Sequence, residues 1–380
     1  MIVRNGLLYG PDGGWYRKDL SLSGRYIADG PADEDETLDA DGCYVVPGLI
    51  DLHFHGCGGA DFCDGTETAL KQMAAFQLSR GVTTMVPASM SLPLPLLSRL
   101  FSTAASFMRR QQDSRTDAFR MASMAGINME GPYLAPGKCG AHRADYLCSP
   151  SMEEFRLLRT ASGGLIRLIT IAPELPGAMD FIREFRDTLR ISLGHTCASY
   201  DIASRAFRSG ACHVTHLYNA MPPFSHRESG LIGAAFDSSS VTAELICDGV
   251  HVSPTAVRAA FSMFGPERIV LISDSMRAAG LRDGTWDLGG QQVTVSGNQA
   301  RLADGTIAGS VTCLFDCVRT AVSAGIPVSD AFRCASENPA RCLGLYDRVG
   351  SLEPGKLADL LVVGPDFTLR HVIHMGFLIF

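Results

Sequence analysis

The sequence lacks long apolar runs and an excess of basic residues. No uninterrupted apolar stretch reaches the roughly 18 residues of a transmembrane helix, and Met1–Gly6 shows no apolar segment of a secretory signal. The 33 basic and 40 acidic residues give a net charge of −7, which argues against a nucleic-acid-binding protein. We therefore expect a protein with neither a membrane nor a nucleic acid as its partner.

The chain also lacks a CxxC pair, although it contains twelve cysteines. The cysteines are scattered, and Cys313 and Cys317 have the closest spacing. A disulfide scaffold is not expected at this length without a secretory signal, so we expect a cytoplasmic protein with reduced thiols. A hydrophobic content of 46% and a charged content of 19% are typical of a globular protein with a sizeable core.

Short apolar runs alternate with segments of helical periodicity from residue 45 onward. Eight runs are present, at Val45–Leu52, Val82–Pro87, Ala125–Met129, Leu165–Ile171, Ile191–Leu193, Ala211–Thr215, Ala243–Cys247 and Arg268–Ile272. Helical segments between them include Thr66–Arg80, Pro95–Arg110, Ser151–Thr160, Met179–Thr188, Tyr200–Ser209 and Ser253–Phe264. This order predicts an α/β fold with a (β/α)8 TIM-type barrel. A doubly wound sheet is the alternative, but it normally has fewer strands, and no GxGxxG follows the first run.

The two ends of the chain have a different pattern, in which apolar and polar residues alternate between Gly, Asp and Pro positions. We expect residues 1–44 and 346–380 to form one small β-sandwich domain, and residues 45–345 to form the barrel. Within the barrel, residues 281–306 predict a β-hairpin insertion with turns near Gly289-Gly290 and Asp304-Gly305.

Side chains that can bind a metal ion follow several of the predicted barrel strands. His53 and His55 have the i, i+2 spacing that places two imidazoles on the same side of a strand. Since reactive groups of such barrels lie at the carboxyl ends of the strands, one rim should collect His53, His55, Glu130, His195, His216 and Asp274. Nitrogen and oxygen ligands predict a divalent metal, with zinc first and iron, manganese or cobalt as alternatives.

Further residues are candidates for catalysis or substrate binding. A divalent ion lowers the pKa of bound water, and Asp274 would act as the general base; its alternative interpretation is a helix N-cap. His142, in the loop after the third strand, is placed to polarise a carbonyl group. Arg227 and His251 together suit an anionic group such as phosphate, although each alone is equally well interpreted as a loop residue. We assign no such role to His213, His226, His371 and His374.

The residues in this order resemble the amidohydrolase superfamily and, within it, the N-acetylglucosamine-6-phosphate deacetylase family. The resemblance covers nearly the whole chain. It is carried by Pro47–Gly59 (PGLIDLHFHGCGG), Met129–Tyr133 (MEGPY), Gly194–His195, Thr215–Pro222 (THLYNAMP), Arg227–Gly233 (RESGLIG), Asp248–Val252 (DGVHV), Ser273–Asp274 and Ser351–Asp359 (SLEPGKLAD).

The resemblance implies a role for each matching residue. Glu130, His195 and His216 match the principal metal ligands, and Glu130 stands where the superfamily usually has a carboxylated lysine. The pair His53 and His55 implies a second ion, so that one or two ions are expected per subunit. The remaining matches are Asp274 as the catalytic acid/base, His142 as a substrate-contacting histidine, and Asn219, Ala220, Arg227 and His251 as sugar-phosphate contacts.

The expected reaction is hydrolysis of the acetamide of N-acetylglucosamine 6-phosphate to glucosamine 6-phosphate and acetate, in amino-sugar catabolism. Arg227 would reach the neighbouring subunit's site, which implies a homodimer. Many members have Thr-Asp-Ala where this chain has Ser273-Asp274-Ser275, so the galacto epimer stays open as a substrate. A cyclic-amide or N-acyl-amino-acid hydrolase needs no phosphate-binding residues, and a non-catalytic assembly protein would be expected to lose metal ligands.

Overall fold

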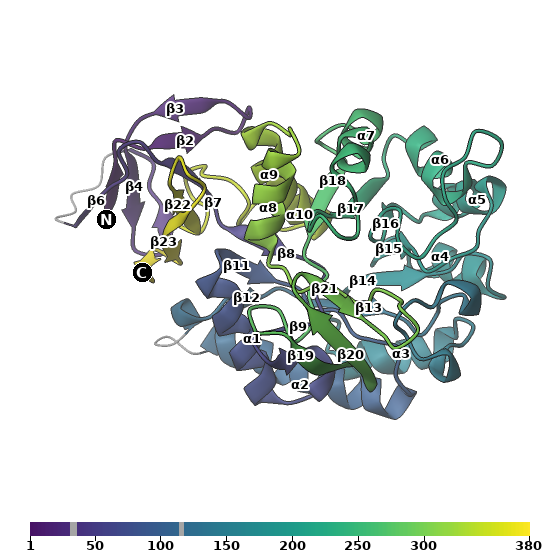
Figure 1. Cartoon of the computed structure of the whole chain (residues 1–380). Coiled ribbons are helices and arrows are strands. Elements are labelled where there is room, and N and C mark those ends of the chain that lie inside the picture. The colour runs from purple at the N-terminus through teal and green to yellow at the C-terminus, as the bar shows by residue number, and fades with distance from the viewer. Residues whose placement is uncertain (31–35, 114–117) are drawn as a thin grey trace.

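Parallel strands and helices alternate through most of the chain in the computed structural model, which describes residues 1–30, 36–113 and 118–380 (Figure 1). Two parallel sheets have the strand orders β12-β11-β8 and β13-β14-β15-β16-β17-β18. Their strands are β8 (Leu49–Asp51), β11 (Val82–Met85), β12 (Ser123–Met124), β13 (Ile127–Glu130), β14 (Ile166–Ile171), β15 (Arg190–Leu193), β16 (His213–Val214), β17 (Thr242–Ile246) and β18 (Ile269–Ile272). The predicted α/β barrel class is confirmed.

Backbone contacts join the two sheets at the carboxyl ends of their strands. Ala88 and Asn128 form a parallel bridge between the segment after β11 and β13. The amide of Asp274, after β18, donates to the carbonyl of His53, after β8, at 2.9 Å. These contacts close the barrel at the end where the candidate ligands lie.

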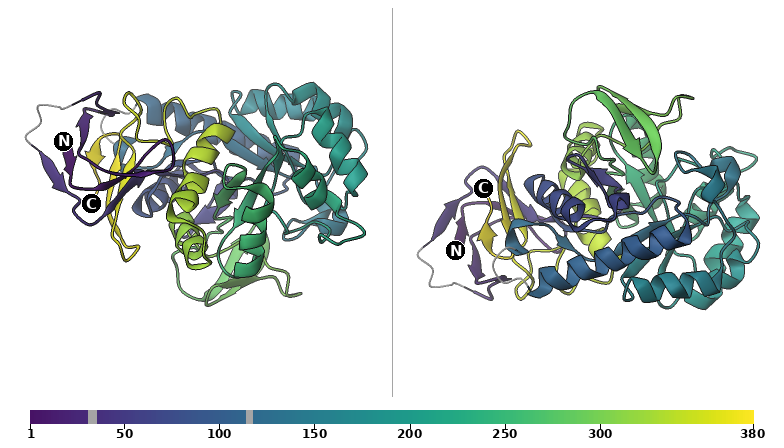
Figure 2. Two further views of the ribbon diagram at one scale, coloured as in Figure 1. Left: turned by 90° about the horizontal axis from the view of Figure 1, so that it is seen from above. Right: turned by 90° about the horizontal axis from the view of Figure 1, so that it is seen from below.

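Helices cover the outside of the barrel strands (Figure 2). They are α1 (Glu67–Ser79), α2 (Leu94–Asp113), α3 (Met152–Ala161), α4 (Ala178–Phe185), α5 (Tyr200–Ser209), α6 (Gly230–Asp237), α7 (Pro254–Phe264), α8 (Leu314–Ser323), α9 (Val328–Ala335) and α10 (Glu337–Cys342). Short 3-10 turns occupy Phe62–Asp64, Ala118–Arg120, Pro136–Lys138 and Ala144–Tyr146. The side chains of Thr66, Ser151 and Ser253 cap α1, α3 and α7, each accepting from a backbone amide three residues on, which fixes where these helices begin. Within the described residues, no helix is both long and apolar enough to cross a membrane.

Strands from both ends of the chain pair in the smaller β-rich part (Figure 1). One sheet has the order β5-β4-β1-β6 and the other β24-β23-β22-β7-β2-β3. Their strands are β1 (Ile2–Arg4), β2 (Leu7–Tyr9), β3 (Trp15–Arg17), β4 (Leu20–Ser23), β5 (Tyr26–Ile27), β6 (Thr37–Asp39), β7 (Tyr44–Pro47), β22 (Leu360–Val363), β23 (Leu369–His374) and β24 (Phe377–Leu378). Val3, Leu22, Val45 and Leu360 belong to the apolar core that the two sheets share.

The first predicted strand, Val45–Leu52, divides into two strands at Gly48. β7 pairs with β22 in the β-rich part, whereas β8 pairs with β11 in the barrel. A Cβ atom at Gly48 would lie 2.3 Å from Oγ1 of Thr83, so only glycine allows this close approach. The continuous apolar run therefore serves two sheets rather than one.

The insertion after β18 has three antiparallel strands rather than a two-stranded hairpin. They are β19 (Gly284–Leu288), β20 (Gln291–Ser296) and β21 (Gln299–Arg301), and the predicted turn at Gly289-Gly290 joins the first two. Apolar side chains of this sheet pack with Met90 and Ala141, and the Gln291 amide donates to the Ala141 carbonyl at 2.6 Å. The insertion thus lies beside the loop that carries His142. A separate short hairpin pairs β9 (Gly56–Cys57) with β10 (Ala60–Asp61).

Candidate metal centre and active site

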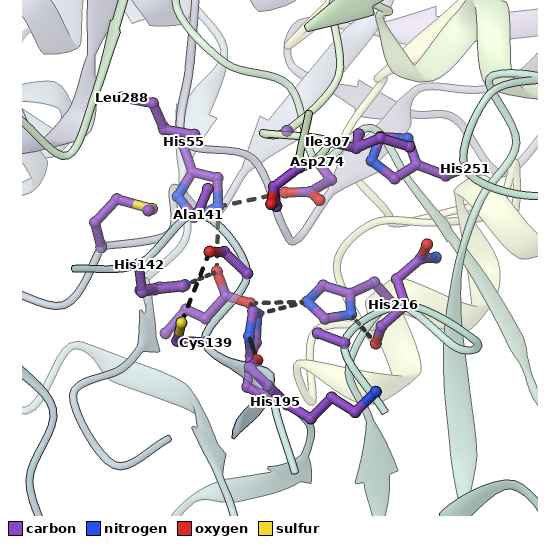
Figure 3. Close-up of a pocket in the computed structure, with 18 of the residues that line it drawn as sticks. His55, Cys139, Ala141, His142, His195, His216, His251, Asp274, Leu288 and Ile307 are labelled. Carbon is purple, nitrogen blue, oxygen red and sulfur yellow. Dashed lines mark hydrogen bonds and ion pairs between the residues drawn. The ribbon is translucent and has the colours of Figure 1, made fainter. Parts of the chain in front are cut away.

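The six predicted ligands converge at the carboxyl ends of the barrel strands, and five of them form two overlapping groups. One group is His53, His55 and Glu130, and the other is Glu130, His195 and His216. Each group offers ligand atoms within 4.8 Å of one another, and all of these side chains are buried. Figure 3 shows the imidazoles of His55, His195 and His216 directed toward a common centre.

Glu130 lies at the centre of the cluster and contacts one group with each oxygen. Its Oε2 atom lies 3.3 Å from Nε2 of His53 and 3.1 Å from Nε2 of His55. Its Oε1 atom lies 3.2 Å from Nε2 of His195 and 3.1 Å from Nε2 of His216. Asp274 completes the first group, because its Oδ1 atom lies 3.3 Å from Nε2 of His55. A carboxylate in this position suits a ligand that two ions share.

The other ring nitrogen of each ligand histidine fixes its tautomer. Nδ1 of His55, His195 and His216 faces a backbone carbonyl, and Nδ1 of His53 faces the carboxylate of Glu244. Because these partners only accept hydrogen bonds, each Nδ1 carries the proton in the neutral ring, and each Nε2 presents a lone pair. The distances to Ala88 O, Lys138 O, Asn219 O and Glu244 Oε2 are 3.2, 2.7, 3.2 and 2.8 Å.

The four Nε2 lone pairs of these histidines face the carboxylates of Glu130 and Asp274. Such an arrangement of buried acceptors is stable only with positive charge between them. Nε2 of His195 and Nε2 of His216 lie 3.0 Å apart, so two acceptors face each other. Nε2 of His53 and Oδ1 of Asp274 are buried without a hydrogen-bond partner in the described part of the chain. These orphaned acceptors and the nitrogen–oxygen donor set fit a divalent cation.

The pKa shifts within the cluster also indicate that positive charge is favoured there. Burial opposes protonation of His55, but the Asp274 and Glu130 carboxylates beside its Nε2 atom outweigh it and raise its pKa to about 10. Burial likewise opposes ionisation of Glu130, but the positive charge of His53 and three further imidazoles hold its pKa well below the usual range. The carboxylates are therefore ionised at neutral pH.

His142 differs from the four ligand histidines. The backbone amide of Ser91 donates to its Nδ1 atom at 3.0 Å, so Nδ1 accepts and Nε2 carries the proton. Burial lowers the pKa of His142 to about 4, which keeps the ring neutral at physiological pH. Its Nε2 atom lies 3.4 Å from Oε2 of Glu130. His142 is thus a hydrogen-bond donor at the edge of the cluster, whereas the other four rings present Nε2 lone pairs to it.

A buried carboxylate behind the ligands, Glu244, was not expected from the sequence. Oε2 accepts from Nδ1 of His53 at 2.8 Å and from the backbone amide of His216 at 3.0 Å. Oε1 contacts Nε2 of His213, which explains why that histidine is buried without being a ligand. The signal that could have found Glu244 is a single acidic residue inside the apolar run Ala243–Cys247. Glu244 links both ligand groups.

Left-handed backbone conformations cluster at this rim. His195, His216 and Asp274 have φ values of 46°, 27° and 47°, and the following loop has φ values of 79° at Tyr218 and 53° at Ala220. Such conformations cost about 1–3 kcal/mol each and persist where the surroundings enforce them. They turn the chain sharply at the strand ends, with the side chains of His195, His216 and Asp274 in the mouth of the barrel (Figure 3).

A cavity of about 470 Å³ opens above the metal centre. Asn219, Ala220 and His251 line it together with His142 and most of the ligands, and Asp248 orients the His251 ring through an Nδ1 contact of 2.7 Å. Thr306, in the segment after β21, also lines it and was not expected from the sequence. Arg227 is exposed and lies outside this lining, so the structure does not bring it to the site of its own chain.

The barrel with this cluster at its carboxyl rim defines a class of metal-dependent hydrolases. Residues 44–378 match the amidohydrolase family, and the chain belongs to this family. It is 38% identical over 324 residues to N-acetylglucosamine-6-phosphate deacetylase of Bacillus subtilis (strain 168), a match covering 85% of this chain and 81% of that protein. It is also 33% identical over 334 residues to N-acetylgalactosamine-6-phosphate deacetylase of Escherichia coli O157:H7, covering 87% and 86%.

The fold is similar to solved structures of the same kind of enzyme. N-acetyl-D-glucosamine-6-phosphate deacetylase from Mycobacterium smegmatis, solved as an aspartate-to-alanine variant in complex with N-acetyl-D-glucosamine-6-phosphate, matches with a TM-score of 0.92 and 34% identity. That match covers 100% of this chain and 99% of the other. The family resemblance that the motifs indicated is confirmed.

Proposed function

We propose that this protein hydrolyses the acetamide of N-acetylglucosamine 6-phosphate to glucosamine 6-phosphate and acetate, in amino-sugar catabolism. The observation that carries the proposal is the Glu130 cluster beside the N–H group of His142, in a chain 38% identical to a deacetylase of that name. Amide hydrolysis needs a hydrogen-bond donor that stabilises negative charge on the carbonyl oxygen and a general base that activates water. The site offers His142 for the first role and Asp274 for the second.

One or two divalent ions would be held by His53, His55 and Glu130 and by Glu130, His195 and His216. We propose zinc, with iron, manganese or cobalt as alternatives, because all of them accept imidazole and carboxylate ligands. When bound, such an ion lowers the pKa of water and polarises a carbonyl group.

The chain's own residues supply the proton transfers and the orientation of the substrate. Asp274, ionised and with Oδ1 free of hydrogen-bond partners among the described residues, accepts the proton of the attacking water. It then returns that proton to the amide nitrogen, which cannot leave as an anion. His142 donates its Nε2 proton toward the developing negative charge on the acetyl oxygen.

The sugar phosphate occupies the cavity above these groups. His251, Asn219 and Ala220 lie on its wall, where they contact the sugar phosphate. Arg227 is exposed, and we propose that it enters the phosphate site of a neighbouring subunit in a homodimer. A cytoplasmic location fits the free cysteines.

The galacto epimer is the second candidate substrate, because the chain is 33% identical to a deacetylase named for N-acetylgalactosamine 6-phosphate. A non-catalytic role is disfavoured, because all six predicted side chains are present and lie together at the candidate metal centre.

The test is acetate release by the purified protein from both phosphorylated epimers and from unphosphorylated N-acetylglucosamine, with metal content measured on the same sample. We expect release only from phosphorylated substrates, fastest from the gluco epimer, and its loss with a chelator. Release from the galacto epimer alone would reassign the substrate. No release from any of the three, despite bound metal, would contradict the proposal.

A further inference from the structure

A second cavity, of about 350 Å³, lies between the β-rich part and the barrel. Arg25 and Tyr26 enter it from the start of β5, and Arg167 enters from the N-terminal end of β14. Arg348 enters from the segment after α10. The cavity thus faces the amino ends of the barrel strands, at the end of the barrel opposite the metal centre.

Three exposed guanidinium groups line this cavity, and none of them has an anionic partner among the described residues. No Asp or Glu belongs to its lining, and none of Arg25, Arg167 and Arg348 forms an ion pair with a described residue. The side chain of Arg25 contacts the sulfur of Met375, which also lines the cavity, at 2.7 Å. Uncompensated positive charges that face one space favour an anion there, and this occurs in a chain with a net charge of −7.

The neighbouring backbone determines the path of the Arg167 side chain to this cavity. A Cβ atom at Gly126 would lie 2.4 Å from Cγ of Arg167, so the arginine stem crosses the bare backbone of this glycine. Only a residue without a side chain at position 126 leaves that path open. The position of Arg167 is therefore built into the junction between β12 and β13.

The remaining lining suits the organic part of a ligand. Met108, Leu345 and Leu357 provide apolar walls, and the ring of Tyr26 is 53% exposed. Guanidinium groups bind phosphate oxygens in pairs of parallel hydrogen bonds, and a cavity of this volume is within the range of small-molecule sites. The described lining contains no histidine or carboxylate, so it offers binding and no acid–base chemistry.

We propose that this cavity is a second, non-catalytic site for a small organic phosphate of about the size of a hexose phosphate. Arg25 belongs to the β-rich part and Arg167 to the barrel, so a bound phosphate ester connects the two parts of the chain. A ligand that binds only the folded state stabilises that state, so occupancy of this cavity raises the melting temperature.

The test is calorimetric titration of the metal-loaded protein with glucose 6-phosphate, which lacks an acetamide and is not hydrolysed. The test variant is Arg167→Gln/Arg348→Gln. The matched control is Arg99→Gln/Arg205→Gln, which removes two exposed arginines that lie outside the cavity and form no ion pair with a described residue. Acetate release, expected to be unchanged, and circular dichroism check the folding of both variants.

We expect the wild type and the control to bind one equivalent more than the test variant, since each guanidinium removed weakens binding by roughly tenfold. Any equivalent left in the test variant belongs to the catalytic cavity. Equal stoichiometry and affinity in all three proteins, or no binding to any of them, would overturn the proposal. If the test variant does not fold, Arg25→Gln, on an exposed turn, serves in its place. A loss of roughly tenfold in the affinity of the second equivalent is then expected, and unchanged affinity would overturn the proposal.

Discussion

Replacing Glu244 by glutamine tests whether the carboxylate behind the ligands organises the metal centre. The substitution keeps the size of the side chain but removes its charge and replaces one oxygen by an amide NH₂ group. Oε2 now accepts from Nδ1 of His53 at 2.8 Å and from the amide of His216 at 3.0 Å. Oε1 contacts Nε2 of His213 at 3.2 Å. One residue thus holds ligands of both groups.

The expected cost follows from these contacts. The glutamine oxygen can keep the two bonds of Oε2, and His213 can accept from the new NH₂ group by moving its proton to Nδ1, beside the Thr242 hydroxyl. What is lost is the charge assistance of the His53 bond, worth about 1–2 kcal/mol. Substitutions of this kind lower metal affinity by about 10–100-fold, or about 1.4–2.7 kcal/mol, a range that overlaps this loss.

The assay is metal affinity, measured by competition with a chelator of known affinity, on Glu244→Gln and the wild type. Glu337→Gln is the matched control, since Glu337 is also buried and carries an ion pair of 2.9 Å with Arg341, but it does not contact the cluster. We expect the control to lose stability and keep its metal affinity. Wild-type affinity in Glu244→Gln, or an equal loss in the control, would refute the reasoning.

Three further predictions concern single residues. Asp274→Asn is expected to keep its metal and to lower acetate release about 10²–10⁴-fold through loss of the base, and near-normal turnover would contradict that role. His142→Gln is expected to lower kcat about 10²–10³-fold at unchanged metal content, measured on one sample; a parallel loss of metal would instead make His142 a ligand. Burial, opposed by the charge of Arg277, raises the pKa of Asp61 from 3.8 to about 6, which corresponds to about 3 kcal/mol. This stabilisation is present below about pH 4 and lost as the pH rises through about 6, so thermal unfolding of Asp61→Asn should depend less on pH, and identical profiles would argue against it.

Much of the fold could be predicted because most barrel strands are short apolar runs, and several of these runs lead directly into polar residues. The predicted helix Tyr200–Ser209 has the bounds of α5 for a similar reason, since one face is apolar. The helix α6 was missed because its sequence, Gly230–Asp237, is apolar on nearly every side and has no helical period. The division of the first run at Gly48 was also hidden, since an apolar run does not indicate which sheet each half joins.

At the site, too, the sequence indicates which residue types are present but not which contacts they make. His53, His55 and Glu130 are recognisable from spacing and from their places after strands. Glu244 is not, because the role of an acidic residue inside an apolar run depends on its partners in the folded structure, which the sequence does not give. Arg227 illustrates the converse: its sequence context indicates a phosphate contact, whereas in the structure it is exposed and lies outside the cavity lining of its own chain.

The difference between a histidine that binds a metal and one that donates a proton lies on the far side of the ring. His195 and His142 both place Nε2 within 3.4 Å of Glu130, so distance to the carboxylate does not separate them. Nδ1 of His195 faces the carbonyl of Lys138, whereas Nδ1 of His142 faces the amide N–H of Ser91. An acceptor behind the ring leaves a lone pair in front, and a donor behind it leaves a proton in front. Tertiary structure brings these backbone groups behind the rings, and the sequence pattern therefore locates the histidines but does not assign their roles.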